Sequence, residues 1–296
     1  MDPVYLQSMV DRPPASASLD AKKNSGVDMR TWINKRPVIS YYALTIALTW
    51  GYWFTLIAQG KQVVPGSSTS HLPGLLGPLV AAFVITAITE GRSGIIDLLG
   101  RMVRWRSAWP RGVLLALSPL AIAGTIFAGL YLVGTPLPSL QQFQSYPGLP
   151  GGLPFWVMML LVLVVNGFGE EVGWRGFMTE KLLLRYNPFQ TTVLVAFFWI
   201  VWHVPVFWLN QSMAVLIGPM LVGWALGLVC GAFVLAHLYL YSGRSILVIA
   251  LWHATYNIVV AVPAAEGVPA AAVSTVVMVW GVVVAWIWWK DARKKR

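Results

Sequence analysis

The chain has 296 residues, of which 57% are hydrophobic and only 11% are charged, whereas about 25% of the residues in an ordinary soluble protein carry charge. This composition excludes a disordered chain, a coiled coil and a nucleic-acid-binding arm, and the single cysteine, Cys230, excludes disulfides and cysteine-based metal sites. The net charge of +10 comes from short basic clusters between long hydrophobic runs, a distribution typical of multi-pass membrane proteins. We therefore expect the lipid bilayer, and no nucleic acid, as a partner.

Eight hydrophobic stretches approach the length of about 20 residues that a membrane-spanning helix needs. In chain order they are Val38–Ala58, Leu72–Thr89, Gly112–Gly134, Pro154–Gly169, Gln190–Leu209, Met213–Tyr241, Ser245–Val262 and Val268–Trp289. The fourth stretch is short at its charged end, and the sixth is longer than a straight span requires. The sequence predicts an all-α fold, a polytopic membrane bundle of about eight transmembrane helices.

The basic residues predict which side of the membrane each connection faces. If the N-terminus is cytoplasmic, an eight-span chain places every Lys and Arg except Lys61 on the cytoplasmic side, in agreement with the positive-inside rule. We therefore expect both termini in the cytoplasm. Residues 1–36 are predicted to form a disordered tail, residues 37–290 the transmembrane bundle, and residues 291–296 a basic tail.

The fourth stretch ends at two adjacent carboxylates, Glu170 and Glu171, which are followed by Arg175. Ionisable side chains at membrane depth are costly and usually functional. On a helix, Glu171 and Arg175 are four residues apart and can pair on one face, whereas Glu170 points about 100° away from Glu171 and is free to face a cavity. The alternative interpretation is a salt bridge at the end of the helix.

Two later stretches carry histidines among hydrophobic residues. His203 lies in the fifth stretch, where a lone histidine is more often a structural residue that bonds a carbonyl group. In the seventh stretch, His253 and Asn257 are four residues apart and project from one helix face, where they could also bond a neighbouring helix. The three polar features together, on three different spans, favour a functional site.

The chemistry that these residue types favour is hydrolysis by an activated water molecule. A buried glutamate can accept a proton from water, and an imidazole and a carboxamide can donate hydrogen bonds to a tetrahedral oxyanion. Alternatively, Glu170, His203 and His253 could hold a zinc ion that leaves one position for water. We favour the metal-free arrangement, because Asn257 beside His253 has the form of an oxyanion-binding pair.

These motifs resemble those of the CPBP family of intramembrane proteases, which includes the type II CAAX prenyl endopeptidases and bacteriocin-processing, self-immunity and lysostaphin-resistance-A-like proteins. The family pattern EExxxR matches Glu170–Arg175, and the pattern of His followed four residues later by Asn or Asp matches His253 and Asn257. The pattern FxxxH ends at His203, but Trp199 stands where the family has phenylalanine. The resemblance covers about residues 155–262, which we expect to form the protease core.

The resemblance also implies roles for these residues. Glu170 would be the catalytic base, His203 would help to position and activate the water, and His253 with Asn257 would form the oxyanion site. Glu171 would belong to the same catalytic set. Because the family has been described both as metalloproteases and as glutamate-dependent proteases, the resemblance leaves a zinc cofactor open.

The function implied by the resemblance is an intramembrane endopeptidase of a prokaryotic cell membrane. Its substrate would be a membrane-bound or lipidated peptide, with prenylated CAAX-type peptides as one class, and Arg175 would support the geometry of the site. We expect the active-site cavity to open towards the cytoplasm and sideways into the lipid. Two alternatives stay open: a non-catalytic self-immunity or scaffold protein on the same fold, and a proton-coupled transporter.

Overall fold

The computed structural model of the chain describes residues 28–64, 68–105 and 109–294. Within these residues the secondary structure is mainly helical, and an isolated β-bridge joins Val63 and Asn210. Elements labelled η are 3₁₀-helices (η2, η5) or π-helices (η3, η4). The elements in chain order are α2 (Met29–Lys35), α3 (Pro37–Ala58), α4 (Leu72–Leu75), α5 (Gly77–Thr89), α6 (Gly91–Met102), α7 (Arg111–Ala116), α8 (Ser118–Leu132), η2 (Leu140–Phe143), α9 (Phe155–Val162), η3 (Leu163–Phe168), α10 (Gly169–Glu171), η4 (Val172–Thr179), α11 (Glu180–Leu183), α12 (Pro188–Trp202), α13 (Val206–Leu209), α14 (Gln211–Ala214), α15 (Pro219–Tyr241), α16 (Ile246–Ala261), η5 (Pro263–Ala265) and α17 (Val268–Lys294).

The expected multi-pass helical bundle is confirmed by the lengths and hydrophobicity of these helices. Among the described residues, five helical stretches are long and apolar enough to cross a membrane: Leu72–Thr89, Phe155–Leu183, Pro188–Leu209, Pro219–Tyr241 and Val268–Lys294. The shorter apolar helices α8 and α16 and the 22-residue helix α3 pack with them. The protein is therefore an integral, multi-pass membrane protein, while the count of eight spans and the side of each terminus stay predictions.

The fourth predicted span differs most from the structure. We expected it to end at Gly169, but one continuous helical stretch runs from Phe155 to Leu183 over 29 residues. The carboxylates do not end the helix, because Glu171 is paired within it with Arg175. Glu170 therefore lies near the middle of the helix, roughly 20 Å from either end at a rise of about 1.5 Å per residue.

The same stretch changes its helical type on both sides of the carboxylates. The π-helix η3 precedes α10 and the longer π-helix η4 follows it, and π-helical turns are found frequently at functional sites. The Thr179 hydroxyl donates a hydrogen bond to the carbonyl of Trp174, five residues earlier, at 2.9 Å. The widened turns bring every side of the helix against protein, since all residues of α10 and η4 are buried.

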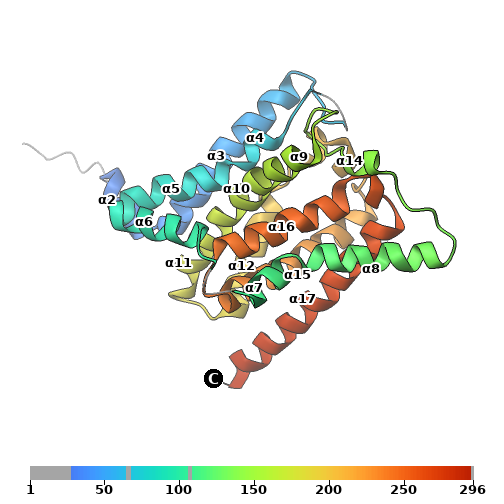
Figure 1. The fold of residues 1–296 in the computed structure, drawn as a ribbon. Helices are drawn as coiled ribbons and strands as arrows, with labels where there is room; N and C mark the ends of the chain where they lie inside the picture. Colours follow the sequence, from blue (N-terminus) through green and yellow to red (C-terminus); the bar gives the residue numbers. More distant parts are fainter. Residues whose placement is uncertain (1–27, 65–67, 106–108, 295–296) are drawn as a thin grey trace, which may run out of the picture.

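The helix that carries α10 lies at the centre of the bundle, between α5 and α16 (Figure 1). Small residues allow this close packing. At Gly167, a Cβ atom would lie 2.6 Å from the carbonyl oxygen of Ala250 in α16, and at Gly173 one would lie 2.7 Å from that of Pro78 in α5. The catalytic candidates of this helix are therefore held by direct backbone contact on two sides.

Four other predicted spans are interrupted: the second at Leu76, the third at Leu117, and the sixth and fifth as follows. The sixth, expected to run from Met213 to Tyr241, divides into α14 and α15, with Gly218 at a positive φ of 122° and Pro219 at the first position of α15. The excess length that we noted is therefore a turn and not a longer membrane helix. In the fifth span, α12 ends at Trp202 and α13 begins after Pro205, whose missing N–H cannot continue the helical hydrogen bonds.

The ends of the chain are more helical than expected. Residues 1–27 of the predicted disordered tail lie outside the described residues, but Met29–Lys35 forms α2. The Asp28 carboxylate caps this helix by accepting hydrogen bonds from the Arg30 N–H and the Thr31 hydroxyl. At the other end α17 continues to Lys294, so the predicted basic tail is helical as far as it is described.

Candidate active site

Glu171 is fully buried at the centre of the bundle and makes two polar contacts. Its Oε1 atom accepts a hydrogen bond from Nη1 of Arg175 at 2.9 Å, and the Nδ1 atom of His253 lies 2.7 Å from the same oxygen. The Glu171 side chain is 0% exposed and that of Arg175 is 1% exposed. The predicted pairing of Glu171 with Arg175 on one helix face is therefore present, and it is linked to α16 through His253.

Trp199 of α12 contacts four of the predicted site residues. Its indole Nε1 donates a hydrogen bond to Oε2 of Glu170 at 2.8 Å. The guanidinium carbon of Arg175 lies 4.5 Å from the centre of the indole ring, within the range of cation–π attraction. The ring also meets that of His253 edge to face at 5.6 Å, and the Trp199 carbonyl is bonded to Nδ1 of His203 at 2.7 Å. Trp199 therefore connects α10, η4 and α16.

His203 occupies the C-cap of α12, where the helix ends. Its ring packs edge-on against Trp202 at 4.8 Å and against Trp224 of α15 at 5.4 Å between ring centres. Because Nδ1 is used by the Trp199 carbonyl, Nε2 is the ring nitrogen that could meet a water molecule or a substrate. The carbonyl contact that we named as the structural alternative for His203 is thus present, and it orients the ring at the same time.

Asn257 lies one turn after His253 on the half-buried side of α16. The structure shows no hydrogen bond between its side chain and any of the described residues. It brings Glu170, Glu171, Arg175 and His253 together around Trp199, but it does not join Asn257 to this group. The oxyanion role of Asn257 stays a prediction.

The carbonyl and carboxylate partners decide which nitrogen of each histidine carries the proton. Both acceptors can only receive a hydrogen bond, so Nδ1 of His203 and Nδ1 of His253 must each be protonated. A neutral ring then has a lone pair at Nε2 and accepts a hydrogen bond there. It follows that His253 can donate a hydrogen bond from Nε2 only as an imidazolium, a charge that its contact with Glu171 would neutralise.

The histidine geometry also bears on the predicted zinc site of Glu170, His203 and His253. Zinc-bound histidines commonly donate their second ring N–H to a carbonyl or carboxylate, which is the arrangement of both rings. Yet among the residues that the structure describes, no three His, Cys, Asp or Glu side chains are gathered closely enough to hold a metal ion. The donors fit zinc in kind but not in their spacing, and we assign no chemical step to a metal.

Two polar atoms at this centre are buried without a hydrogen-bond partner among the described residues. They are Oε2 of Glu171 and Nη2 of Arg175. Unsatisfied buried polar atoms are costly in a protein interior. A water molecule or a polar group of a substrate could supply the partner that each of these two atoms needs.

Trp199 was not predicted as a partner of Glu170. The sequence marks it only as the residue that stands where the family pattern has phenylalanine. The indole, however, has an N–H donor that phenylalanine lacks, and a donor in a hydrophobic span next to a motif histidine was the signal that could have revealed it.

The comparisons with known proteins agree with this region of the structure. Residues 152–259 match the family model of the Rce1-like type II CAAX prenyl endopeptidases. The chain is also 28% identical over 180 residues to the "CAAX prenyl protease 2" of Methanococcus maripaludis, an alignment that covers 58% of this chain and 63% of that protein. The chain thus spans less than two thirds of the relative's length. The matched segment includes Glu170, His203, His253 and Asn257, and both comparisons support the resemblance of this region to the Rce1-like type II CAAX prenyl endopeptidases.

Proposed function

We propose that this protein is an intramembrane endopeptidase in which the Glu170 carboxylate activates a water molecule. The observation that carries this proposal is the setting of Glu170, which is 3% exposed at the middle of a 29-residue helix. Its Oε2 atom is held by the indole of Trp199, which leaves Oε1 for a water molecule. Glu171, in contrast, is already bonded to both Arg175 and His253, which suits a residue that holds this histidine in place and not the base itself.

In this mechanism Glu170 takes a proton from water while the water oxygen attacks the carbonyl carbon of the peptide bond. The carbonyl oxygen becomes a tetrahedral oxyanion. The proton is then passed to the nitrogen of the leaving amine, the C–N bond breaks, and the Glu170 carboxylate is restored. The hydrogen bond from Trp199 keeps the carboxylate in one orientation through both transfers.

The oxyanion requires hydrogen-bond donors in the buried site. His253 supplies one from Nε2 when its ring is an imidazolium, because its Nδ1–H is already directed at Glu171. Asn257, one turn further along α16, supplies an amide N–H. His203 has the opposite polarity when neutral: with Nδ1 bonded to the Trp199 carbonyl, its Nε2 accepts a hydrogen bond and can orient the attacking water.

The position of Glu170 changes our expectation of how a substrate reaches it. The sequence placed this residue at the cytoplasmic end of a span, whereas it lies roughly halfway along its helix. The peptide bond must therefore reach the middle of the bundle, which suits a substrate whose lipid or hydrophobic segment already lies in the bilayer. A prenylated CAAX peptide is our first candidate, because the archaeal relative is named a CAAX prenyl protease.

The test is cleavage by the purified full-length chain in lipid nanodiscs. A farnesylated CAAX peptide, the same peptide without its prenyl group and a hydrophobic transmembrane peptide are each incubated with the wild-type protein, with Glu170→Gln and with Glu90→Gln. We expect wild-type cleavage of the farnesylated peptide, a rate at least about 100-fold lower for Glu170→Gln, and a nearly normal rate for Glu90→Gln.

Three results would contradict the proposal. More than about a tenth of the wild-type rate in Glu170→Gln would assign the base to another residue. Cleavage of the transmembrane peptide alone would refute the prenylated substrate. No cleavage of any peptide, with normal folding, would favour the immunity, scaffold or transport alternatives.

A metal-free reaction is a separate part of the proposal, and it has its own measurement. We expect the chelator-washed protein to contain far less than one zinc ion per chain by elemental analysis and to keep its activity. One zinc per chain, lost in a His203→Ala, His253→Ala double variant and required for activity, would establish the metal mechanism instead.

A further inference from the structure

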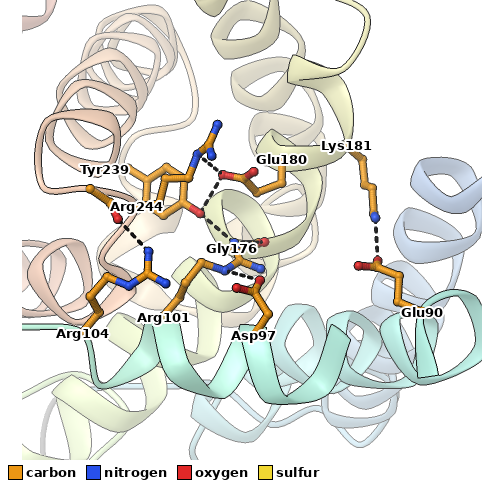
Figure 2. Close-up of polar contacts among 10 residues, drawn as sticks. Glu90, Asp97, Arg101, Arg104, Gly176, Glu180, Lys181, Tyr239 and Arg244 are labelled. Carbon is orange, nitrogen blue, oxygen red and sulfur yellow. Dashed lines mark hydrogen bonds and ion pairs between the residues drawn. The ribbon is translucent and has the colours of Figure 1, made fainter. Parts of the chain in front are cut away.

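A second polar cluster lies near the C-terminal end of the helix Phe155–Leu183. Its central residue, Arg101, comes 75 residues before its partner Gly176 in the chain. Figure 2 shows side chains from α6, α11 and α15 directed towards one another around the end of η4. We call it the Arg101 cluster. It consists of Asp97, Arg101, Glu180, Tyr239 and Arg244.

Arg101 is the centre of this cluster, and it is only 9% exposed. Its Nη1 atom donates to the carbonyl oxygen of Gly176 and to the Tyr239 hydroxyl, each at 2.7 Å. Its Nε atom lies 2.9 Å from the Asp97 carboxylate one turn earlier on α6. One guanidinium therefore bonds the backbone of η4 and a side chain of α15 while it is held in place from its own helix.

Glu180 and Arg244 hold the Tyr239 hydroxyl, which accepts a hydrogen bond from Arg101. The Tyr239 hydroxyl donates to Oε1 of Glu180 at 2.9 Å, and Nε of Arg244 lies 3.0 Å from the same oxygen. Arg101 thus lies at one end of a chain of bonds that runs through Tyr239 and Glu180 to Arg244, as Figure 2 shows. Such a chain restricts Arg101 to one position.

Gly176 connects this cluster to the candidate active site. It directly follows Arg175, which bonds Glu171 and lies over the ring of Trp199. A Cβ atom at Gly176 would lie 2.7 Å from Cδ1 of Ile246 and 3.2 Å from Cδ1 of Leu98, so η4 packs closely against α16 and α6 at this residue. The Gly176 carbonyl that Arg101 binds therefore belongs to the residue next to Arg175, the cation of the candidate active site.

The π-helix η4 explains why a side chain donates a hydrogen bond to the backbone at Gly176. Its hydrogen bonds connect residues five apart instead of four, so the register of η4 against α10 is not set by regular α-helical bonding. A change to the α-helical register would rotate the residues of η4 relative to the neighbouring helices, and so move the Arg175 guanidinium from its place over the Trp199 ring. A charged donor fixed from α6 opposes that rotation, because a hydrogen bond from an ionised group is stronger than one between neutral groups.

We propose that Arg101 is a positioning residue for the catalytic centre, acting by clamping the Gly176 carbonyl and so holding η4 in its π-helical register. This inference rests on the proposed protease function for its kinetic consequence. Its structural consequence can be measured without any activity.

The experiment compares Arg101→Ala with Arg104→Ala in the full-length protein in nanodiscs. Arg104 is the matched control, because it follows the same helix α6 and donates to the Gly243 carbonyl at 2.9 Å, away from the catalytic helix. The first readout is hydrogen exchange of the backbone amides of residues 172–180, followed by mass spectrometry. The second is kcat and KM for the cleaved peptide.

We expect Arg101→Ala to accelerate exchange in residues 172–180 at least about 10-fold, and to leave residues 190–200 of α12 unchanged. We expect its kcat to fall about 10- to 100-fold with KM within about 3-fold, as for a misplaced catalytic group, while Arg104→Ala matches the wild type. If Arg101→Ala does not fold, Arg101→Lys is measured in the same way, because lysine keeps the charge but loses the fixed fork of donors.

Unchanged exchange in residues 172–180, or a rise in KM with an unchanged kcat, would overturn the positioning role. Acceleration spread evenly over the whole bundle would reduce Arg101 to a general stability residue and would also overturn it. If the wild-type protein cleaves no peptide, the proposed protease function fails, and the exchange data alone still decide whether Arg101 clamps η4.

Discussion

The helix from Phe155 to Leu183 carries ion pairs in two different surroundings. Near its middle, Glu171 and Arg175 are 0% and 1% exposed. Near its end, Lys181 pairs with Glu90 of the α5–α6 junction, and these side chains are 21% and 40% exposed. Water and lipid headgroups can replace the partner in the exposed pair but not in the buried one.

This difference in exposure distinguishes the Lys181–Glu90 pair, a surface contact of the fold, from the Glu171–Arg175 pair, which belongs to the candidate active site. An exposed pair typically contributes about 0–1 kcal/mol, so its loss or gain matters little. A buried pair loses so much hydration that a hydrophobic pair of equal size is often as stable, whereas removal of one partner alone costs about 3–5 kcal/mol. Stability alone therefore does not explain the central pair. Its contact with His253 links it to the chemistry of the candidate active site.

The largest effect on stability is expected at the centre. Glu171→Gln leaves Arg175 buried without its counter-charge, and we expect the free energy of unfolding to fall by about 3–5 kcal/mol in an SDS titration of the purified protein. Peptide cleavage should be lost with it.

The double variant Glu171→Gln, Arg175→Met provides the control for this prediction. It removes both charges, and we expect it to regain most of the lost stability without regaining activity. If the double variant is active, the buried pair is structural and the comparison between the two regions fails.

A smaller effect is expected from Trp199→Phe, which introduces the residue of the family pattern FxxxH. The ring volume is largely kept, but Glu170 loses its indole donor. We expect kcat to fall about 10-fold with KM nearly unchanged, since orientation of the base contributes to the rate and not to binding. Trp202→Phe is the matched control, because its indole nitrogen has no hydrogen-bond partner among the described residues. Equal rates for the two variants would show that the Trp199 bond is dispensable.

The smallest effect is expected at the exposed pair. Lys181→Cys, in a Cys230→Ser background, removes the partner of Glu90, and we expect the free energy of unfolding to change by less than about 1 kcal/mol in the same SDS titration. A loss close to that of Glu171→Gln would show that exposure does not distinguish the two regions.

The same variant tests the predicted topology. Because the basic residues place this end of the helix in the cytoplasm, an impermeant maleimide should label the introduced cysteine only when the cytoplasmic face of sealed vesicles is accessible. Labelling from the opposite face would reverse the orientation of the whole bundle.

Much of this architecture was predictable because it depends on local properties of the chain. Hydrophobic length identified the membrane helices, since a bilayer admits only segments that satisfy their own backbone hydrogen bonds. Rarity of charge in those segments singled out Glu170, His203 and His253. The ends of the helices were predicted less well: Gly169 was taken as an end because charge follows it, although the helix continues once Glu171 is paired with Arg175.

The polar partners were decided by tertiary packing alone. Trp199 counts as an apolar residue in any hydrophobic pattern, and its N–H became a bond to Glu170 only because α12 packs beside α10. Arg101 and Gly176 are 75 residues apart, and nothing in either local segment encodes their contact. Composition and spacing thus establish the membrane, the helices and the reactive residue types, whereas the way in which helices pack determines which buried donor meets which buried acceptor, because that pairing depends on distances between segments far apart in the chain.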